Sequence, residues 1–314
     1  MSITLRFVAA LLLAAAAIPA AAAPAQHFAT PEAALAALRG ALKAGDTARL
    51  TRIVGDDYKA LVTTGEPQVD SQNYAEATLR LNTLASLQAP AADRRILVIG
   101  AEAWPFPIPI VRDGKGWFFD SAEGEDELLN RRIGENELVA IAVLGAYGEA
   151  QTAFAAADRD GDGVREYARR LMSSPGKTDG LYWPAEAGQP ISPWGPLIAA
   201  SAIDPATRTP DQPYRGYRYK VLTAQGPGAA GGAYDYVING HMVGGFGLVA
   251  FPADPGTSGV MTFIVNQNGQ IFEKPLGPDT VAIATAMTGF DPGDGWTAVT
   301  PPADPLITAQ GPTP

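Results

Sequence analysis

The sequence contains no cysteine and only two histidines among its 314 residues. Without cysteine the chain forms no disulfide, offers no thiol nucleophile and builds no thiolate metal site. A serine hydrolase would need His27 or His241 as its base. His27 lies close to the amino terminus, and His241 belongs to the turn Asn239-Gly240-His241, where a polar residue is ordinary. The residue types therefore point to no catalytic side chain and to no bound organic cofactor.

Positive charge is also scarce. The chain has 23 lysines and arginines against 33 aspartates and glutamates, which gives a formal net charge of −10. Such a surface repels the phosphate backbone of nucleic acids and anionic lipid headgroups. We therefore expect no nucleic-acid partner, unless folding hides a basic patch.

A short apolar run lies at the amino terminus, directly after Arg6. Phe7 to Ile18 is apolar, and mostly small residues follow through Ala25, which is the pattern of a secretory signal peptide. The run is shorter than the roughly 20 apolar residues that a membrane-spanning helix needs. We predict a signal peptide over residues 1–25, cleaved after Ala22 or Ala25, with a retained signal anchor as the alternative. The mature protein is then periplasmic or secreted, with no integral membrane span after cleavage.

Residues 26–122 show the pattern of a small α+β domain. Thr30 and Pro31 predict the start of a helix that Gly45 ends, and Asp46 can cap a second helix through Ile53. A strand is predicted over residues 95–100, an edge strand or uncovered ribbon over the proline-rich residues 104–111, and a hairpin turn at residues 113–116. This order resembles the NTF2-like fold, a curved sheet packed on helices. Such folds often hold a pocket. The aromatic residues Trp104, Phe106, Trp117 and Phe119 would either line that pocket or fill the core.

The second domain, residues 123–300, begins with a charged segment and a long helix. No charge occurs from Leu138 to Gly148, and apolar residues lie all round the helical wheel, which indicates burial on more than one face. We expect this helix to run from Glu127 to Ala157 as the spine on which a sheet packs. Strands are predicted over residues 216–222, 233–238, 246–251 and 260–265. The turn Gln267-Asn268-Gly269 then leads into residues 270–273.

The spine helix carries the first specific resemblance. The residues that share its pattern are Asn136, Glu137, Ala140, Ile141, Leu144, Ala150, Gln151 and Phe154, followed by Tyr167-Ala168. They resemble the spine of pilin-like and pseudopilin-like proteins, in which a long helix carries a small antiparallel sheet. True pilins begin with a membrane-spanning half-helix, whereas a whole domain precedes the spine here, so the resemblance implies a globular scaffold and no pilus subunit.

Most of the mature chain is similar to the exported bacterial family known as domain of unknown function 2950. The segments RRIGENELVAI, DGDGVREYA and DGLYWP carry this similarity. The expected fold class is therefore α+β, with an NTF2-like helix-plus-curved-sheet domain followed by a pilin-like domain whose long spine helix packs on an antiparallel sheet. Residues 301–314 are proline-rich without an apolar pattern, and we expect a disordered tail.

One acidic loop after the spine helix has the spacing of a cation site. Oxygen ligands from the side chains of Asp158, Asp160, Asp162 and Glu166 and from the Val164 carbonyl would suit calcium. Arg169 stands where an EF-hand loop has its bidentate glutamate, so a shorter loop closed by Glu166 is the form we expect. The alternative is a solvated acidic turn that ends the helix. Calcium is the only cofactor to which the sequence points.

The loop from Ser173 to Pro196 is the second candidate for binding. It is long, rich in proline and glycine, and carries Tyr182, Trp183 and Trp194. Loops of this length are usually functional or disordered. These three aromatic residues would either recognise an envelope protein or glycan, or cover the core.

Two hypotheses of function follow from these patterns. The first is an exported, non-catalytic cell-envelope protein that binds a partner or serves as an assembly scaffold. The alternative is an enzyme that acts on an envelope polymer, with its site between the two domains.

Overall fold

The computed structural model describes residues 22–184, 190–195 and 212–300. The predicted disordered tail and all but the last residues of the predicted signal peptide lie outside these ranges. The chain divides into two compact units, residues 1–128 and 129–314. Their boundary falls inside one continuous helix, six residues after the boundary predicted at 122/123.

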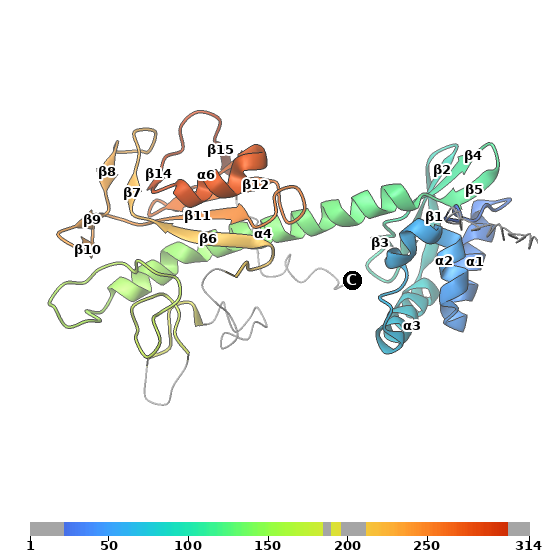
Figure 1. The fold of residues 1–314 in the computed structure, drawn as a ribbon, viewed down its shortest axis with the longest axis horizontal. Coiled ribbons are helices and arrows are strands. Elements are labelled where there is room, and N and C mark those ends of the chain that lie inside the picture. The colour runs from blue at the N-terminus through green and yellow to red at the C-terminus, as the bar shows by residue number, and fades with distance from the viewer. Residues whose placement is uncertain (1–21, 185–189, 196–211, 301–314) are drawn as a thin grey trace, which may run out of the picture. The chain divides into compact units, whose positions relative to one another are not determined.

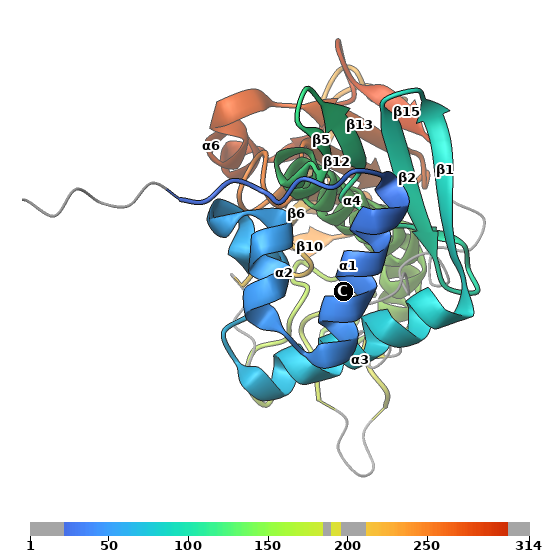
Figure 2. The same cartoon turned by 90° about the vertical axis from the view of Figure 1, so that its right-hand side faces the viewer.

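The helices of the first unit form where capping residues begin and end them. Thr30 Oγ1 accepts a hydrogen bond from the Ala33 amide at 3.1 Å, Gly45 ends the first helix with φ of 62°, and Asp46 caps the second. These features confirm both predicted helices. A further helix was missed because its sequence is polar and no side chain caps its start. The elements are α1 (Pro31–Ala44), α2 (Thr47–Val54), the 3-10 helix η1 (Asp56–Leu61) and α3 (Pro67–Thr83). Figure 1 and Figure 2 label α1, α2 and α3.

The sheet of the first unit is antiparallel throughout, in the order β1-β2-β4-β5, with β3 paired to β2. The proline-rich run does not form one edge strand. It divides into β3 and β4 with Pro107 and Pro109 between them, because proline lacks the amide that an interior strand needs. The strands are β1 (Ala85–Ala91), β2 (Arg94–Ile99), β3 (Trp104–Pro105), β4 (Ile110–Asp113) and β5 (Gly116–Phe119).

The core of the first unit lies between this sheet and the helices. Trp117 and Phe119 of β5 are buried in it, and Trp104 and Phe106 are half-buried against it. Buried side chains from α1, α2 and β4 complete the cluster, among them Leu38, Leu50, Ile53 and Ile110. The four aromatic residues therefore belong to the core packing.

The spine helix is continuous. Helix α4 spans Ser121–Ala155, so it begins six residues earlier and ends two residues earlier than predicted. Six consecutive residues, Val139 to Leu144, are buried. Since six residues make more than one and a half helical turns, α4 is covered on every side along this stretch, as its uncharged sequence predicts.

The second unit is built on a five-stranded antiparallel sheet in the order β15-β13-β12-β11-β6. The predicted turn at Gln267–Gly269 joins β12 to β13, and Gly269 adopts φ of 76° there. The strands are β6 (Tyr217–Leu222), β11 (Gly247–Pro252), β12 (Met261–Asn266), β13 (Ile271–Pro275) and β15 (Thr297–Val299). Every residue of β11 is buried, as expected for a central strand with both faces covered.

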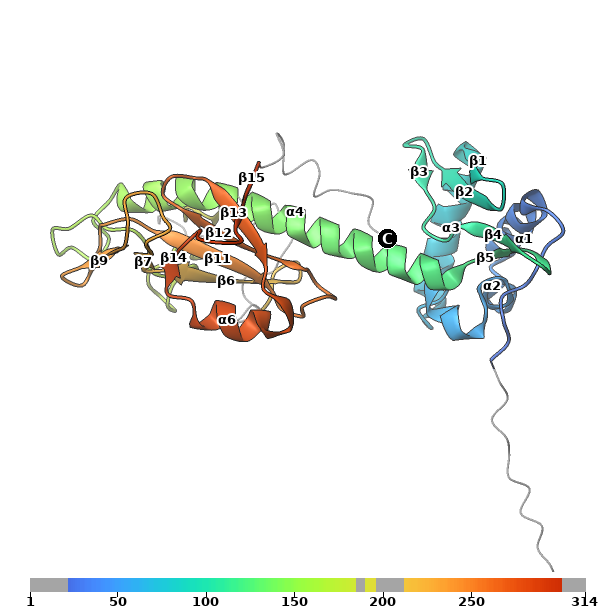
Figure 3. The same ribbon diagram turned by 90° about the horizontal axis from the view of Figure 1, so that it is seen from above.

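Helices cover both faces of this sheet, α4 on one and α6 (Thr280–Ala286) on the other, as Figure 3 shows. Leu248, Ala250 and Phe263 join α4 in one buried cluster, whereas Val249 and Ile264 join α6 in another. This division follows from the alternation of side chains along a strand. The remaining elements of the described residues are η2 (Gly277–Asp279), the small sheet β14-β7-β8 (Gly289–Phe290, Ala224–Gln225 and Tyr234–Asp235) and the hairpin β9-β10 (Val237–Ile238 and His241–Met242).

Helix α4 is also long and apolar enough to cross a membrane, by length and composition alone. A buried core helix meets the same criteria. Buried residues of α4 pack against the sheet and against the segment that follows the helix.

Candidate functional site

The acidic loop directly after α4 brings three of its carboxylates together. One oxygen each from Asp158, Asp160 and Asp162 lies within 4.8 Å of the others. The two oxygens of Asp158 accept hydrogen bonds from the amides of Gly161, at 2.8 Å, and Gly163, at 2.9 Å. These bonds, that from Gly163 first, hold the pKa of Asp158 below its usual value. The loop therefore keeps Asp158 ionised and fixes the turn.

The other two predicted ligands are placed differently. The Val164 amide donates to Asp162 Oδ1 at 2.8 Å. Glu166 lies outside the group of three, and its Oε2 accepts a hydrogen bond from the Met242 amide at 2.9 Å. Glu166 thus joins the segment after α4 to β10. The arrangement of the three aspartates fits a hard cation, since carboxylate oxygens are the ligands that calcium prefers, and calcium binding stays a prediction.

His241 lies beside this loop. The sequence did not predict this position. Its Nδ1 is 3.4 Å from Asp162 Oδ2 and 3.8 Å from Glu166 Oε2. The hairpin β9-β10 carries His241, and the bond between Glu166 and Met242 holds that hairpin against the loop. Asp162 and His241 lie 79 positions apart in the chain, and spacing within the sequence indicates contacts only between near neighbours, so the sequence did not predict this contact.

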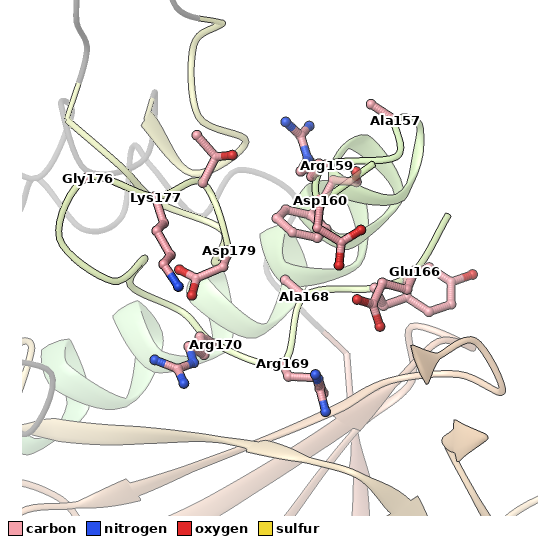
Figure 4. Close-up of a pocket in the computed structure, with 13 residues that line it drawn as sticks. Ala157, Arg159, Asp160, Glu166, Ala168, Arg169, Arg170, Gly176, Lys177 and Asp179 are labelled. Carbon is pink, nitrogen blue, oxygen red and sulfur yellow. Dashed lines mark hydrogen bonds between the residues drawn. The ribbon is translucent and has the colours of Figure 1, made fainter. Parts of the chain in front are cut away.

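A pocket of about 750 Å³ opens next to the acidic loop (Figure 4). Its charged lining consists of four basic residues, Arg159, Arg169, Arg170 and Lys177, and three acidic ones, Asp160, Glu166 and Asp179. Phe154 and Tyr167 add aromatic surface. The basic residues outnumber the acidic ones here, although the whole chain has a net charge of −10.

Arg159 is held in place by two aromatic rings. Its guanidinium carbon lies 4.8 Å from the centre of the Phe154 ring and 5.0 Å from that of Trp183. Its Nε also donates to the Phe154 carbonyl at 3.0 Å, at the carboxyl end of α4 where a cation is favoured. Burial lowers the pKa of Arg159, but an arginine stays charged in proteins. The geometry therefore presents a fixed positive charge.

A second fixed arrangement lies on the loop that carries Lys177. Asp179 accepts hydrogen bonds from the Ser174 amide at 2.7 Å and the Ser174 hydroxyl at 2.9 Å. Arg170 Nη1 donates to the same hydroxyl at 2.9 Å. Burial raises the pKa of Asp179, but the bonds from Ser174 and the charge of Arg170 outweigh it, so the pKa lies below its usual value. Asp179 is thus an ionised acceptor rather than a proton donor.

The three aromatic residues predicted to bind a partner are buried. Tyr182, Trp183 and Trp194 are 7%, 3% and 6% exposed and belong to the core cluster around α4. Trp183 Nε1 donates to the Pro190 carbonyl at 2.9 Å, and its ring supports Arg159. Their burial agrees with the alternative that the loop covers the core. Direct contact between these residues and a partner stays a prediction.

The fold and the site define an α+β protein with a spine helix and a charged pocket at its end. The chain matches the family described as "Protein of unknown function (DUF2950)" over residues 25–299, and it belongs to that family. No curated protein matches the chain. No solved structure matches it either.

Proposed function

We propose that this chain is an exported, non-catalytic protein of the cell envelope that binds a partner through the pocket beyond α4. Within this proposal the first unit is an NTF2-like domain, and the second is a pilin-like scaffold that presents the pocket. Export rests on the basic, apolar and small-residue segments of residues 1–25. The absence of cysteine is compatible with an oxidising compartment, since no thiol can be oxidised there.

The pocket is the observation that supports binding. Arg159, Arg169, Arg170 and Lys177 line it in a chain that is otherwise acidic. A local excess of positive charge attracts anionic groups. Arginine pairs well with carboxylate or phosphate because its guanidinium presents several donors in one plane. A partner that carries such groups, as envelope proteins and acidic glycans do, would therefore fit.

The acids in the pocket are better suited to orientation than to proton transfer. Glu166 accepts an amide hydrogen bond from Met242, and Asp179 accepts two hydrogen bonds from Ser174. A general acid at neutral pH needs a raised pKa, whereas the pKa of Asp179 is lowered. This difference argues against Asp179 as a general acid.

A photo-crosslinking experiment in intact cells tests the proposal. A photoreactive residue would replace Lys177 at the pocket or, as the control, Lys115 on the exposed hairpin of the first unit. We expect an envelope molecule to be crosslinked at position 177 and not at 115. A protein with the double substitution Arg170→Ala and Lys177→Ala should capture that envelope molecule more weakly than the wild-type protein does, whereas one with Arg112→Ala and Lys115→Ala should capture it equally well.

Two outcomes would contradict the proposal. Equal crosslinking at positions 177 and 115 would remove the pocket as the binding site. The enzyme alternative would be favoured instead if the purified protein turned over an envelope polymer and if substitution of any carboxylate in the pocket abolished that turnover.

A further inference from the structure

The chain that precedes α1 is tied to the first unit from Ala23 onward. The Ala23 amide donates to Asp56 Oδ2 at 3.1 Å, and the Asp56 amide donates back to the Ala23 carbonyl at 3.0 Å. The Gln26 amide then donates to the Arg52 carbonyl at 2.9 Å. This segment runs before α1 in the darkest blue of Figure 2.

The same segment continues to a single antiparallel bridge with β5. Phe28 and Trp117 exchange two backbone hydrogen bonds, at 2.7 and 2.8 Å. Gly116 is required at this contact, since a Cβ on it would lie 2.6 Å from the Phe28 carbonyl oxygen. His27 Nε2 also lies 3.0 Å from Asp113 Oδ2. Residues 23–28 therefore belong to the folded unit.

Gly55 shows that residues 23–25 themselves have a place in this fold. Its backbone adopts φ of 94°, which other residues rarely adopt. A Cβ on Gly55 would lie 3.1 Å from the Ala25 nitrogen and 3.5 Å from the Ala23 oxygen. The end of α2 is thus shaped for close approach by the three residues that a cut after Ala25 would remove.

We infer that the leader is removed at the Ala22–Ala23 bond, so that the mature protein begins at Ala23 with its α-amino group against Asp56. This inference rests on the proposed export. Hydrolysis by a leader peptidase consumes one water and leaves a carboxylate on Ala22 and an amine on Ala23. That amine is largely protonated at neutral pH, since α-amino groups have a pKa of about 7.7–8.0. The hydrogen bond from the Ala23 nitrogen to the Asp56 carboxylate then becomes charge-assisted, and a charge-assisted hydrogen bond is stronger than a neutral one.

A cut after Ala25 would leave a less complete unit. The Asp56 amide would lose its acceptor, the Ala23 carbonyl, and the Asp56 carboxylate would lose the one hydrogen bond that it accepts among the described residues. Both sites offer alanine at the last and third-last leader positions, so the sequence alone does not choose between them. The contacts of residues 23–25 identify the product that the fold accommodates.

Processing can be tested on the exported full chain by amino-terminal sequencing and intact mass. We expect a single mature form that begins at Ala23. The substitution Ala20→Gln removes the small third-last leader residue that only a cut after Ala22 requires. The substitution Ala25→Gln removes the small last leader residue that only a cut after Ala25 requires. The first should abolish cleavage at Ala22–Ala23 and the second should leave it unchanged. A mature form that begins at Gln26, or the reverse response of the two variants, would overturn the inference.

Stability gives an independent readout. Mature chains that begin at Ala23 and at Gln26 should differ in the melting midpoint of the first unit by on the order of 5 °C. Asp56→Asn should lower the midpoint of the Ala23 form and leave that of the Gln26 form unchanged. Equal midpoints for the two wild-type forms would contradict the proposed contact. Retention of the whole chain in the cytoplasm would instead refute export, whereas export with a different amino terminus would refute only this cleavage site.

Discussion

The side chain of Gln151 holds the backbone of Ala168 through two hydrogen bonds. Nε2 donates to the Ala168 carbonyl at 2.8 Å, and Oε1 accepts from the Ala168 amide at 2.8 Å. Nε2 also donates to the Tyr147 hydroxyl at 2.7 Å, and that hydroxyl lies 3.1 Å from the Gly247 carbonyl of β11. One turn of α4 thus fixes both the sheet and the segment that leads from the acidic loop to the pocket.

Replacing Gln151 by alanine should strongly destabilise the second unit. Gln151 is fully buried, so its loss leaves the Ala168 amide and carbonyl without partners in the core. Each unsatisfied buried group costs about 1–3 kcal/mol, and we expect a decrease of about 3 kcal/mol or more in the free energy of unfolding. Urea unfolding measures it.

Two further variants make this test specific. Gln88→Ala, on the exposed strand β1, should change the free energy of unfolding by less than about 0.5 kcal/mol. Tyr147→Phe should couple to Gln151→Ala in a double-mutant cycle, because the two side chains share a hydrogen bond. A loss below about 1 kcal/mol for Gln151→Ala would contradict the role of this side chain.

Glu137 should anchor the chain that enters β12. Its Oε1 accepts hydrogen bonds from the amides of Val260, at 2.9 Å, and Met261, at 3.0 Å. Glu137→Ala removes the oxygen that accepts both bonds, whereas Glu137→Gln keeps one side-chain carbonyl oxygen. Amide hydrogen exchange at residues 260 and 261 should therefore accelerate strongly in the alanine variant and less in the glutamine variant. Equal exchange in wild type and Glu137→Ala would be inconsistent with this contact.

Asp70 should make the first unit sensitive to acid. Thr63 donates a hydrogen bond to Asp70 Oδ2, and the Thr64 amide donates to Oδ1 at 2.7 Å. These bonds, that from Thr63 first, hold the pKa of Asp70 below its usual value. A lowered pKa adds stability that is present above the unfolded value of about 3.9 and is lost as pH falls through the folded value.

Acid titration of unfolding tests this prediction. The stability difference between wild type and Asp70→Asn should be constant at neutral pH and shrink below about pH 4. Thr63→Val removes the main cause of the lowered pKa and should move acid unfolding to higher pH. A stability difference that does not change between pH 6 and pH 2 would show that Asp70 does not contribute in this way.

The acidic loop should bind calcium weakly if the predicted site is correct. Three convergent carboxylates and an exposed loop suggest a dissociation constant of roughly 10⁻⁴ to 10⁻³ M. Calorimetric titration should give binding heat that Asp160→Asn reduces, whereas Asp235→Asn on the exposed strand β8 should not. The absence of heat at millimolar calcium would remove the hypothesis and leave a solvated turn.

The helices and the central strands were predictable because their signals are local. Thr30, Gly45 and Asp46 act on amides and carbonyls within a few residues, so the ends of α1 and the start of α2 follow from the sequence. The uncharged stretch of α4 likewise indicates burial, whichever segments of the chain pack against it. In contrast, α3 lacks a capping side chain and a clear apolar face, so the sequence did not predict it.

The candidate site was predictable only in part. The spacing of Asp158, Asp160 and Asp162 indicated a loop whose oxygens converge, and they do. The contact of His241 with that loop depends on segments far apart in the chain. The pocket that joins Arg159 to Lys177 is lined by residues from 154 to 179, but it depends on how this irregular stretch folds back on itself. Aromatic content alone did not indicate that Trp183 supports Arg159 from within the core.

The sequence by itself determined the α+β composition, the continuous spine helix and the acidic turn, because each depends on neighbours within a few residues. Tertiary structure decided which charged groups meet at the end of α4, which aromatic rings are buried, and where Ala23 docks. These outcomes depend on packing between distant segments, since a side chain is buried or exposed only by what folds against it.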